Sequence, residues 1–368
     1  MSRIKNLYAE QGQSPWLDNL KRSYLTGGTL RALVKSGIRG LTSNPTIFQK
    51  AIQGSADYDE QHRELVTAGA TVTEQYWALV LADINDALDE FANLYRDSNR
   101  SDGFVSVEVE PSLAHDEAGS AAKARELHLQ VAKPNLMVKI PGTVEGIGAI
   151  QAMIAEGRNI NITLIFSLDR YQRVMDAYVD GLEAYAATSK PDLAGVASVA
   201  SFFISRVDSE VDARLDAIGT PAALALRGKA AVAQGKLAYQ AFRRTFSGPR
   251  WEALAERGAV VQRPLWASTS TKNPAYPDTL YVDSLIGPDT VNTLPDATIE
   301  AFNDHGTLMR TIDDGVAHAE AVWSGLAEVG VDMEDVAAKL ERDGVASFTQ
   351  SFDDLLAALA DKAATFKS

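Results

Sequence analysis

Lys139 has the clearest chemical potential in this sequence, because it lies near the end of a short apolar run at residues 136–140 that Pro141 and Gly142 follow. Such a run predicts a strand that is buried on both faces, where a charged ammonium group is costly. A lysine held there tends to lose its proton, and a neutral amine can attack a carbonyl carbon. The alternative is a lysine that extends from the strand end into water or pairs with a carboxylate.

Residues that could assist such an amine occur in or just after five other predicted strands. They are Asp18, Asn44, Glu108, Thr163 and the group of Ser201, Phe203 and Arg206. A Schiff-base aldolase needs a lysine that forms an iminium ion, a group that moves protons during dehydration, and carboxylate or amide groups that bind sugar hydroxyls. The residue types therefore favour carbon–carbon bond chemistry at a lysine, without a metal or other cofactor.

Each of these polar residues also has a purely structural interpretation. Asp18 is a suitable helix N-cap, and Asn44 with Pro45 is a suitable turn. Thr163 fits any strand because its side chain is β-branched. Glu108 lies in a valine-rich segment, where it needs either an ion-pair partner or a raised pKa.

Arg206 also allows two interpretations. It follows a predicted strand and could bind a phosphate together with Ser201. It could instead pair at the surface with Asp208 or Glu210, which are close in sequence.

Eight short apolar and β-branched segments recur along the chain and predict the strands that position these residues. They are residues 16–20, 40–43, 105–109, 136–140, 160–166, 197–204, 260–267 and 280–285. Eight strands separated by helical segments favour a closed parallel barrel over an open sheet, and such barrels carry their functional groups at the carboxyl ends of the strands.

Helical patterns occupy most of the intervening chain. Residues 71–95 are the longest of them, and residues 208–246 form two helices separated by a turn at Gly219-Thr220-Pro221. Residues 313–330 and 333–362 add helices at the C-terminal end. We therefore predict a single (β/α)₈ TIM barrel domain over residues 1–368, with additional helices at the C-terminus.

Composition narrows the functional classes. Hydrophobic residues make up 46% of the 368 residues and the formal net charge is −14, which argues against nonspecific binding to nucleic acid. The chain has no cysteine, so thiolate catalysis and cysteine-based zinc sites are excluded. Because we find neither a signal peptide nor a stretch long enough to span a membrane, we expect a cytoplasmic protein with no membrane partner.

Two segments resemble signatures of the transaldolase family. Gly-Leu-Thr-Ser-Asn-Pro-Thr-Ile-Phe at residues 40–48 is similar to its N-terminal signature, and Leu-Met-Val-Lys-Ile-Pro-Gly-Thr at residues 136–143 to its active-site lysine segment. The likeness continues through residues 105–110, 159–167 and 201–206 in the family's order. The resemblance implies an aldolase-type barrel that exchanges a dihydroxyacetone unit between sugar phosphates in the non-oxidative pentose phosphate pathway.

The resemblance also implies roles for the residues that do chemistry. Lys139 would form the Schiff base with the ketose donor, and Asp18 would be the acid/base group for the hydroxyl whose deprotonation breaks the carbon–carbon bond. Glu108 would exchange protons through a water molecule that Thr163 positions.

Further roles implied by the resemblance concern substrate binding. Asn44 and Asn161 would hold the hydroxyls of the dihydroxyacetone unit, and Ser201 would line the same pocket. Phe203 would exclude water from the bound intermediate, which favours transfer over hydrolysis.

The sequence departs from the family at the phosphate site. Many transaldolases have a second arginine after the seventh strand, whereas residues 266–273 here read Trp-Ala-Ser-Thr-Ser-Thr-Lys-Asn. We infer that Ser268 and Lys272 replace part of the phosphate site alongside Arg206. Lysine lacks the bidentate geometry of arginine, so substrate affinity is the property affected. The segment is similar to that of the long bacterial transaldolases.

Other functions remain open from the sequence. A fructose-6-phosphate aldolase or another class I aldolase would share the barrel and the lysine, and a non-catalytic sugar-phosphate-binding barrel would use Lys139 only as a cation. The five histidines lack the paired spacing of metal ligands. We expect sugar phosphates as substrates and either a monomer or a homodimer.

Overall fold

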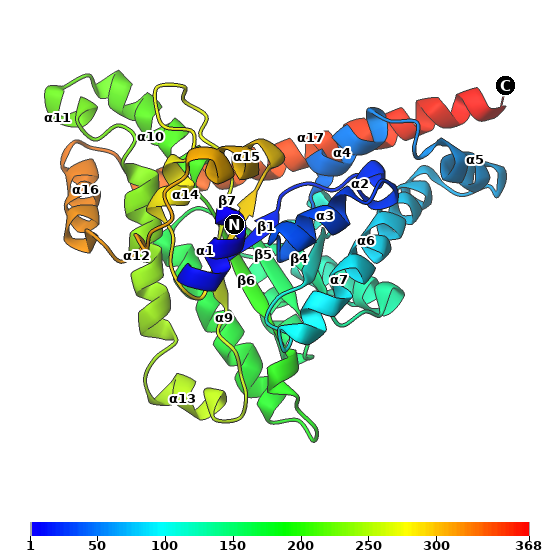
Figure 1. Ribbon diagram of the computed structural model, residues 1–368, viewed down its shortest axis with the longest axis horizontal. Coiled ribbons are helices and arrows are strands. Elements are labelled where there is room, and N and C mark those ends of the chain that lie inside the picture. The colour runs from blue at the N-terminus through cyan, green and yellow to red at the C-terminus, as the bar shows by residue number, and fades with distance from the viewer. Residues whose placement is uncertain (1, 368) are drawn as a thin grey trace.

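The computed structural model, which describes residues 2–367, contains a closed barrel of eight parallel strands (Figure 1). Each strand pairs with its neighbours in chain order, and the eighth pairs with the first. The strands are β1 Gln13–Leu17, β2 Gly40–Thr42, β3 Phe104–Glu108, β4 Leu136–Pro141, β5 Ile160–Ile165, β6 Ser198–Phe203, β7 Arg263–Ala267 and β8 Thr290–Leu294. The predicted barrel is therefore confirmed.

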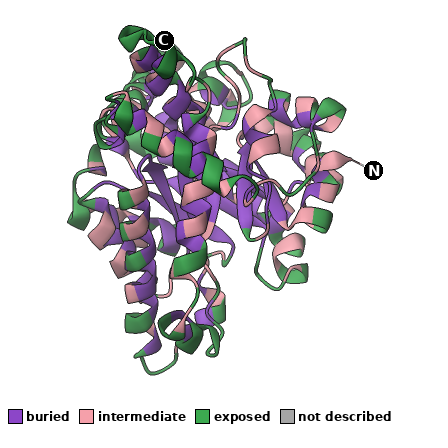
Figure 2. Ribbon diagram, turned by 90° about the vertical axis from the view of Figure 1, so that its left-hand side faces the viewer, coloured by how far each residue is buried: buried purple, intermediate pink, exposed green. Residues whose placement is uncertain are grey.

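Helices surround the barrel and bury its outer face, so the strands lie in the interior of the molecule (Figure 2). Every residue of β3, β4, β5 and β6 is buried, as the apolar runs predict for strands that are covered on both sides. The helices up to β6 are α1 Arg3–Gln11, α2 Arg22–Thr26, α3 Thr29–Ser36, α4 Pro45–Gln53, α5 Asp59–Thr67, α6 Val72–Asp97, α7 Glu117–Val131, α8 Gly146–Ala155 and α9 Leu168–Ala186.

The helices after β6 include the additional C-terminal ones. They are α10 Ser205–Ile218, α11 Pro221–Leu224, α12 Ala230–Thr245, α13 Pro249–Ala255, α14 Leu280–Ser284, α15 Asp296–His305, α16 Val316–Glu328 and α17 Met333–Lys367. Two 3₁₀ turns, η1 Pro111–Leu113 and η2 Leu193–Gly195, complete the described elements. None of the helices within residues 2–367 is both long and apolar enough to cross a membrane.

The prediction of the eighth strand was wrong. Residues 280–285 contain the short helix α14, and the strand that closes the barrel is β8. Short apolar runs do not distinguish a strand from a helix, and here the side chains of Thr279 and Asp283, one helical turn apart, form a hydrogen bond of 2.9 Å. The true strand is Thr-Val-Asn-Thr-Leu, whose buried Asn292 accepts a hydrogen bond of 2.8 Å from Thr269 Oγ1 and interrupts the apolar pattern.

Two smaller boundaries also differ from the prediction. β1 spans Gln13–Leu17 and not the predicted residues 16–20, so Asp18 directly follows the strand and does not lie within it. Residues 208–246 contain parts of three helices, because Pro221 starts the short α11 after Thr220 has capped it. Helix α6 begins after Thr71, which forms a capping box with Glu74.

Helix α17 is the longest helix in the described chain and runs along one side of the barrel as the red rod of Figure 1. It packs against α4, which follows β2, against α6, which precedes β3, and against α10, which follows β6. Gly344 of α17 allows a close approach to the barrel, because a Cβ atom there would lie 2.9 Å from Leu164 Cδ2 of β5. The C-terminal helix is thereby fixed over the carboxyl ends of the strands.

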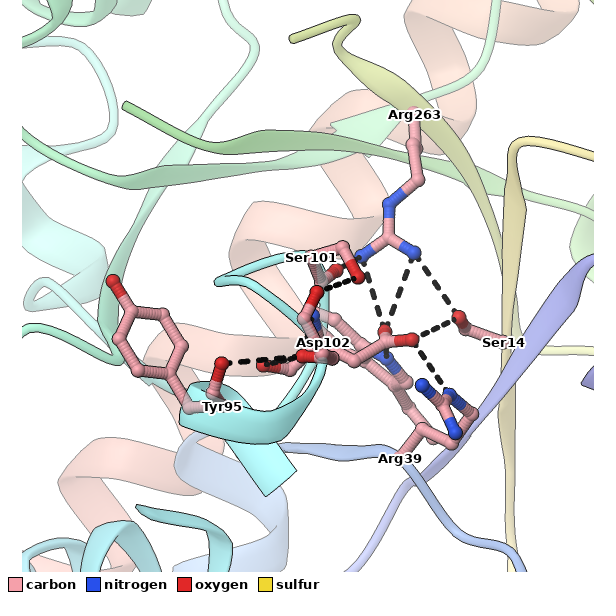
Figure 3. A network of polar contacts seen from close by, with 8 residues as sticks. Ser14, Arg39, Tyr95, Ser101, Asp102 and Arg263 are labelled. Carbon is pink, nitrogen blue, oxygen red and sulfur yellow. Dashed lines mark hydrogen bonds and ion pairs between the residues drawn. The ribbon is translucent and has the colours of Figure 1, made fainter. Parts of the chain in front are cut away.

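The opposite end of the barrel is closed by a buried carboxylate (Figure 3). Asp102, which is fully buried just before β3, forms ion pairs with Arg39 at 2.6 Å and Arg263 at 3.3 Å. It also accepts hydrogen bonds from Ser14 Oγ at 2.8 Å and from Trp16 Nε1 at 3.4 Å. These partners come from β1, β7 and the approach to β2, so one side chain ties together the floor of the barrel.

Candidate active site

A cavity of about 330 Å³ opens at the carboxyl ends of the barrel strands, where functional groups are expected in this fold. Its wall combines strand ends, the start of α4, the loop after β7 and one turn of α17. Nine of the eleven predicted site residues line it: Asp18, Asn44, Lys139, Thr163, Ser201, Phe203, Arg206, Ser268 and Lys272. The other two, Glu108 and Asn161, lie behind this wall and contact residues that belong to it.

Lys139 and Glu108 form a buried pair at the base of the cavity. They occupy the same register level of β4 and β3, and each side chain is at most 6% exposed. Lys139 Nζ lies 2.9 Å from Glu108 Oε2 and donates a hydrogen bond of 3.1 Å to the Ser43 carbonyl oxygen. Burial raises the pKa of Glu108, an effect that the neighbouring Lys139 ammonium opposes. The structure thus excludes a lysine that extends into water, and it shows the carboxylate pair that the alternative interpretation of Lys139 also allowed.

Asp18 faces the same cavity from the end of β1. Its Oδ1 atom accepts a hydrogen bond of 3.0 Å from Thr42 Oγ1. Burial raises the pKa of Asp18, and the charge of Lys139 is the first of the effects that oppose this rise. The N-cap interpretation is excluded, because the first helix after Asp18 is capped at Lys21. A carboxyl group with a raised pKa next to an amine is suited to proton transfer.

Polar residues of β5 and β6 form the adjacent wall. Asn161 Oδ1 accepts a hydrogen bond of 2.7 Å from Ser201 Oγ, and Asn161 Nδ2 donates one of 3.0 Å to Ser106 Oγ. Thr163 Oγ1 is buried without a hydrogen-bonding partner among the described residues. The register of β5 is irregular just beyond Thr163, where Leu164 adopts a φ of 59°. A left-handed backbone at a leucine is strained, and such strain accumulates at functional sites.

Asn44 has both a structural and a cavity-facing position. Its Oδ1 atom caps α4 by accepting a hydrogen bond of 2.9 Å from the Ile47 amide, and Pro45 occupies the first helical position. The residue also lines the cavity. The expected turn at Asn44-Pro45 is therefore the start of a helix.

Arg206 lies at the cavity wall without a carboxylate partner among residues 2–367. Its guanidinium carbon lies 5.1 Å from the ring centre of Phe203 and 6.0 Å from that of Phe348 in α17. Burial lowers the pKa of Arg206. The predicted alternative of a surface pair is excluded, because Asp208 accepts hydrogen bonds from Ala231 and Tyr281, and Glu210 pairs with Arg214 and Lys339. A desolvated, unpaired guanidinium is suited to bind an anion.

Two lysines flank Arg206 at the cavity wall. Lys272 Nζ donates a hydrogen bond of 2.7 Å to Ser270 Oγ, and burial and the charge of Arg206 lower the pKa of Lys272. Lys50 of α4 also lines the cavity, has no ion-pair partner within the described chain, and contributes to the lowered pKa of Lys272. Ser268 begins the loop of Lys272 with a φ of 55°. The cations thus gather from α4, α10 and the loop after β7.

Several residues of the site were not predicted from the sequence. Thr42, Lys50, Ser106 and Phe348 contact or line the site, yet none stands out locally. The position of Lys50 two residues after the 40–48 signature is a signal that could have identified it, because α4 starts at the cavity. Phe348 lies far along the chain, and only the packing of α17 brings it to Arg206.

The histidines do not gather at this site. His115 and His305 are exposed and pair with carboxylates, whereas His62 and His128 are buried. In the part of the chain that the structure describes, no three His, Asp or Glu side chains form a group that could hold a metal ion.

The chain is similar to known proteins along most of its length. The family model for transaldolase/fructose-6-phosphate aldolase matches residues 15–359. A transaldolase of Parafrankia sp. (strain EAN1pec) is 51% identical over 97% of each chain, and one of Frankia alni is 50% identical over 98% of each chain. Transaldolase 1 of Streptomyces coelicolor is 48% identical over 95% of this chain and 92% of its own.

Proposed function

The chain belongs to the transaldolase/fructose-6-phosphate aldolase family, and we propose that it is a transaldolase acting through a Schiff base on Lys139. It moves a dihydroxyacetone unit from sedoheptulose 7-phosphate or fructose 6-phosphate to glyceraldehyde 3-phosphate or erythrose 4-phosphate, in the non-oxidative pentose phosphate pathway. The observation that carries the proposal is the buried contact of 2.9 Å between Lys139 Nζ and Glu108 Oε2 at the base of the cavity.

Formation of the Schiff base is the first step. The neutral amine of Lys139 attacks the C2 carbonyl of the ketose, and the resulting carbinolamine loses water to leave an iminium ion. Glu108 lies close enough to Nζ to accept and return the protons of this step. The buried, unpartnered Oγ1 of Thr163 supports a role in holding the water molecule that carries them.

Cleavage of the C3–C4 bond follows from the iminium ion. The Asp18 carboxylate takes the proton of the C4 hydroxyl, the bond breaks, and its electron pair moves into the iminium to form an enamine while the aldose leaves. The enamine then attacks the aldehyde carbon of the acceptor, and Asp18 returns the proton to the new C4 oxygen. Hydrolysis of the iminium releases the product ketose and restores Lys139.

The hydroxyls of the dihydroxyacetone unit bind near β5 and β6. Asn44 and Asn161 hold them, and Ser201 fixes Asn161 by its hydrogen bond of 2.7 Å. The side-chain nitrogen of Asn44 supports this role, because within residues 2–367 the helix cap uses only the oxygen of this side chain. Phe203 excludes water from the enamine, so that transfer to an aldehyde prevails over hydrolysis.

The phosphate group binds at the cavity wall that Arg206 and Lys272 share. Arg206 supplies a guanidinium without a carboxylate partner in the described chain, and Lys272 and Lys50 add charge from two other elements. Ser268 supplies a hydroxyl from the loop after β7. Three cations from three elements are suited to a terminal phosphate on substrates of different length.

Borohydride reduction with fructose 6-phosphate tests the Schiff base. We expect the reduced three-carbon unit to be attached to Lys139 by peptide mass mapping, with loss of activity. Lys139→Met should give no adduct, whereas Lys35→Met, a change at an exposed lysine of α3, should leave the adduct unchanged. An adduct at another lysine, or none, contradicts the mechanism and favours a non-catalytic binding barrel.

The family model also covers fructose-6-phosphate aldolases, so that activity is the second candidate. The two activities differ in the fate of the enamine. A transaldolase consumes fructose 6-phosphate steadily only when an acceptor such as erythrose 4-phosphate is present. Steady release of free dihydroxyacetone without an acceptor would identify an aldolase instead.

Three expectations from the sequence accompany this proposal. We propose that residues 1–368 form one catalytic domain, that the protein acts in the cytoplasm, and that it is a monomer or a homodimer. Size-exclusion chromatography with light scattering tests the last of these.

A further inference from the structure

A second cavity, of about 650 Å³, lies at the end of the barrel opposite the candidate active site. Its lining comes from the ends of α6, α7 and η2 and from the loops before β3, β4, β5 and β6. Tyr95, beside the Asp102 cluster in Figure 3, belongs to this lining. The volume is within the range of sites that bind small metabolites.

Two polar side chains of this cavity have no partner for a buried atom. His128 of α7 is only 9% exposed, and its Nε2 atom forms no hydrogen bond within residues 2–367. Arg158, in the loop before β5, has a buried Nε atom that is likewise unpaired. Its guanidinium forms no ion pair within residues 2–367. Such buried groups are costly unless a ligand or water satisfies them.

The lining of this cavity contains one cation, Arg158, that has no ion pair within residues 2–367. Three cations, Arg100, Lys133 and Arg158, line the cavity; Arg100 is paired with Asp192 and Lys133 with Asp89, each at 2.7 Å, whereas Arg158 has no ion pair within residues 2–367. Burial, followed by the charge of Arg158, lowers the pKa of His128 to about 4. The Arg158 guanidinium is thus the positive charge of this lining that no carboxylate of residues 2–367 neutralises. The cavity is therefore suited to an anion.

We propose that this cavity binds the phosphate group of a small phosphorylated metabolite through the Arg158 guanidinium, beside the His128 imidazole. Arginine offers a planar fork that matches two phosphate oxygens, and the nearby imidazole reports on the binding of an anion. Leu129, which is 69% exposed, and Pro134 offer an apolar surface for the organic part of the ligand. The site is separate from the substrate cavity, with which it shares no lining residue.

Imidazole NMR of the full-length protein tests the proposal with inorganic phosphate as the probe. No histidine lines the substrate cavity, so the His128 signal reports on the second cavity alone. The signal is assigned by its absence in His128→Gln. We expect a saturable shift of this signal with phosphate, which persists in Arg206→Gln and weakens at least about tenfold in Arg158→Gln.

Further arms of the same experiment define the ligand. Glycerol 3-phosphate should bind more tightly than inorganic phosphate if the apolar surface contributes. Arg158→Lys, which keeps the charge but lacks the fork, should fall between the wild type and Arg158→Gln. Basal activity should be unchanged in both variants, which also verifies their folding. An equal shift with chloride or acetate, no saturation, or loss of the shift in Arg206→Gln would overturn the proposal.

Discussion

Glu108 and Lys139 are cross-strand partners on β3 and β4, and their side chains meet at 2.9 Å inside the barrel. The pair is almost completely buried, so each group compensates the desolvation of the other. This relationship is compatible with both a structural ion pair and an acid/base partner for a Schiff-base lysine. The two interpretations differ in what happens when the carboxylate is replaced by an amide of the same shape.

Glu108→Gln should lower kcat on the order of a hundredfold or more, because the amide cannot take up or return the protons of carbinolamine dehydration. The fold should be retained, as judged by circular dichroism and by thermal unfolding. Steady-state kinetics with fructose 6-phosphate and erythrose 4-phosphate measure the effect. Loss of folding together with activity would instead support the structural ion pair.

Phe203→Ala should increase the fraction of turnovers that end in hydrolysis. The ring lines the cavity, and its removal admits water to the enzyme-bound intermediate. The ratio of free dihydroxyacetone to transferred product should rise severalfold, whereas Phe203→Leu, which keeps an apolar side chain, should change it less. An unchanged ratio in Phe203→Ala would contradict the proposed role.

Lys272→Met should raise KM for fructose 6-phosphate roughly fivefold with little change in kcat, because an exposed cation contributes modest binding energy. Arg206→Met should raise KM far more, on the order of a hundredfold, because its guanidinium is largely desolvated. Unphosphorylated fructose is the matched control substrate. For each variant, the loss of kcat/KM with fructose should be much smaller than the loss with fructose 6-phosphate. Equal losses with both substrates would show that these residues do not bind the phosphate.

Asp102→Ala should destabilise the protein by about 3–5 kcal/mol, because it leaves Arg39 and Arg263 without their shared carboxylate at the floor of the barrel. Denaturant unfolding measures this loss. Activity of the folded fraction should be close to wild type, since the cluster lies at the end of the barrel opposite the substrate cavity. Asp97→Ala, which removes only an exposed pair with Arg96, is the control and should cost little.

Asp208 should make stability fall as the pH rises through the range from about 4 to about 6. Burial raises the pKa of this carboxyl group from 3.8 to about 6, so in that range the folded protein holds a proton that the unfolded chain releases. Asp208→Asn removes this penalty. The gain in unfolding free energy of the variant over the wild type should therefore be larger at pH 8 than at pH 4, by up to about 3 kcal/mol.

Chemical denaturation at both pH values tests this expectation. Asp353→Asn, at an exposed position of α17, is the matched control. If the unfolding free energies of the wild type and Asp208→Asn differed by the same amount at both pH values, the raised pKa of Asp208 would be contradicted. Tyr281 and Ala231, whose hydroxyl and amide groups bind Asp208, should keep their contacts in the amide variant.

Seven of the eight strands, and most of the residues at the candidate site, followed from the sequence alone. Lys139 and Glu108 stood out because an ionisable residue in an apolar run needs a specific partner. The eighth strand did not stand out, because the buried Asn292 and the threonines of β8 interrupt the apolar pattern. The apolar run at 280–285 resembled a strand more closely than the true one.

Only the tertiary structure decided which charges are paired. The sequence places Asp208 and Glu210 next to Arg206, but α10 turns both carboxylates toward other partners and leaves the guanidinium free. Likewise, His128 and Arg158 meet only because α7 and the loop before β5 end at the same face of the barrel. The physical reason is that neighbouring residues in the sequence are enough to indicate which segments are buried. The balance of charge in a cavity instead depends on residues from distant segments that the fold brings together.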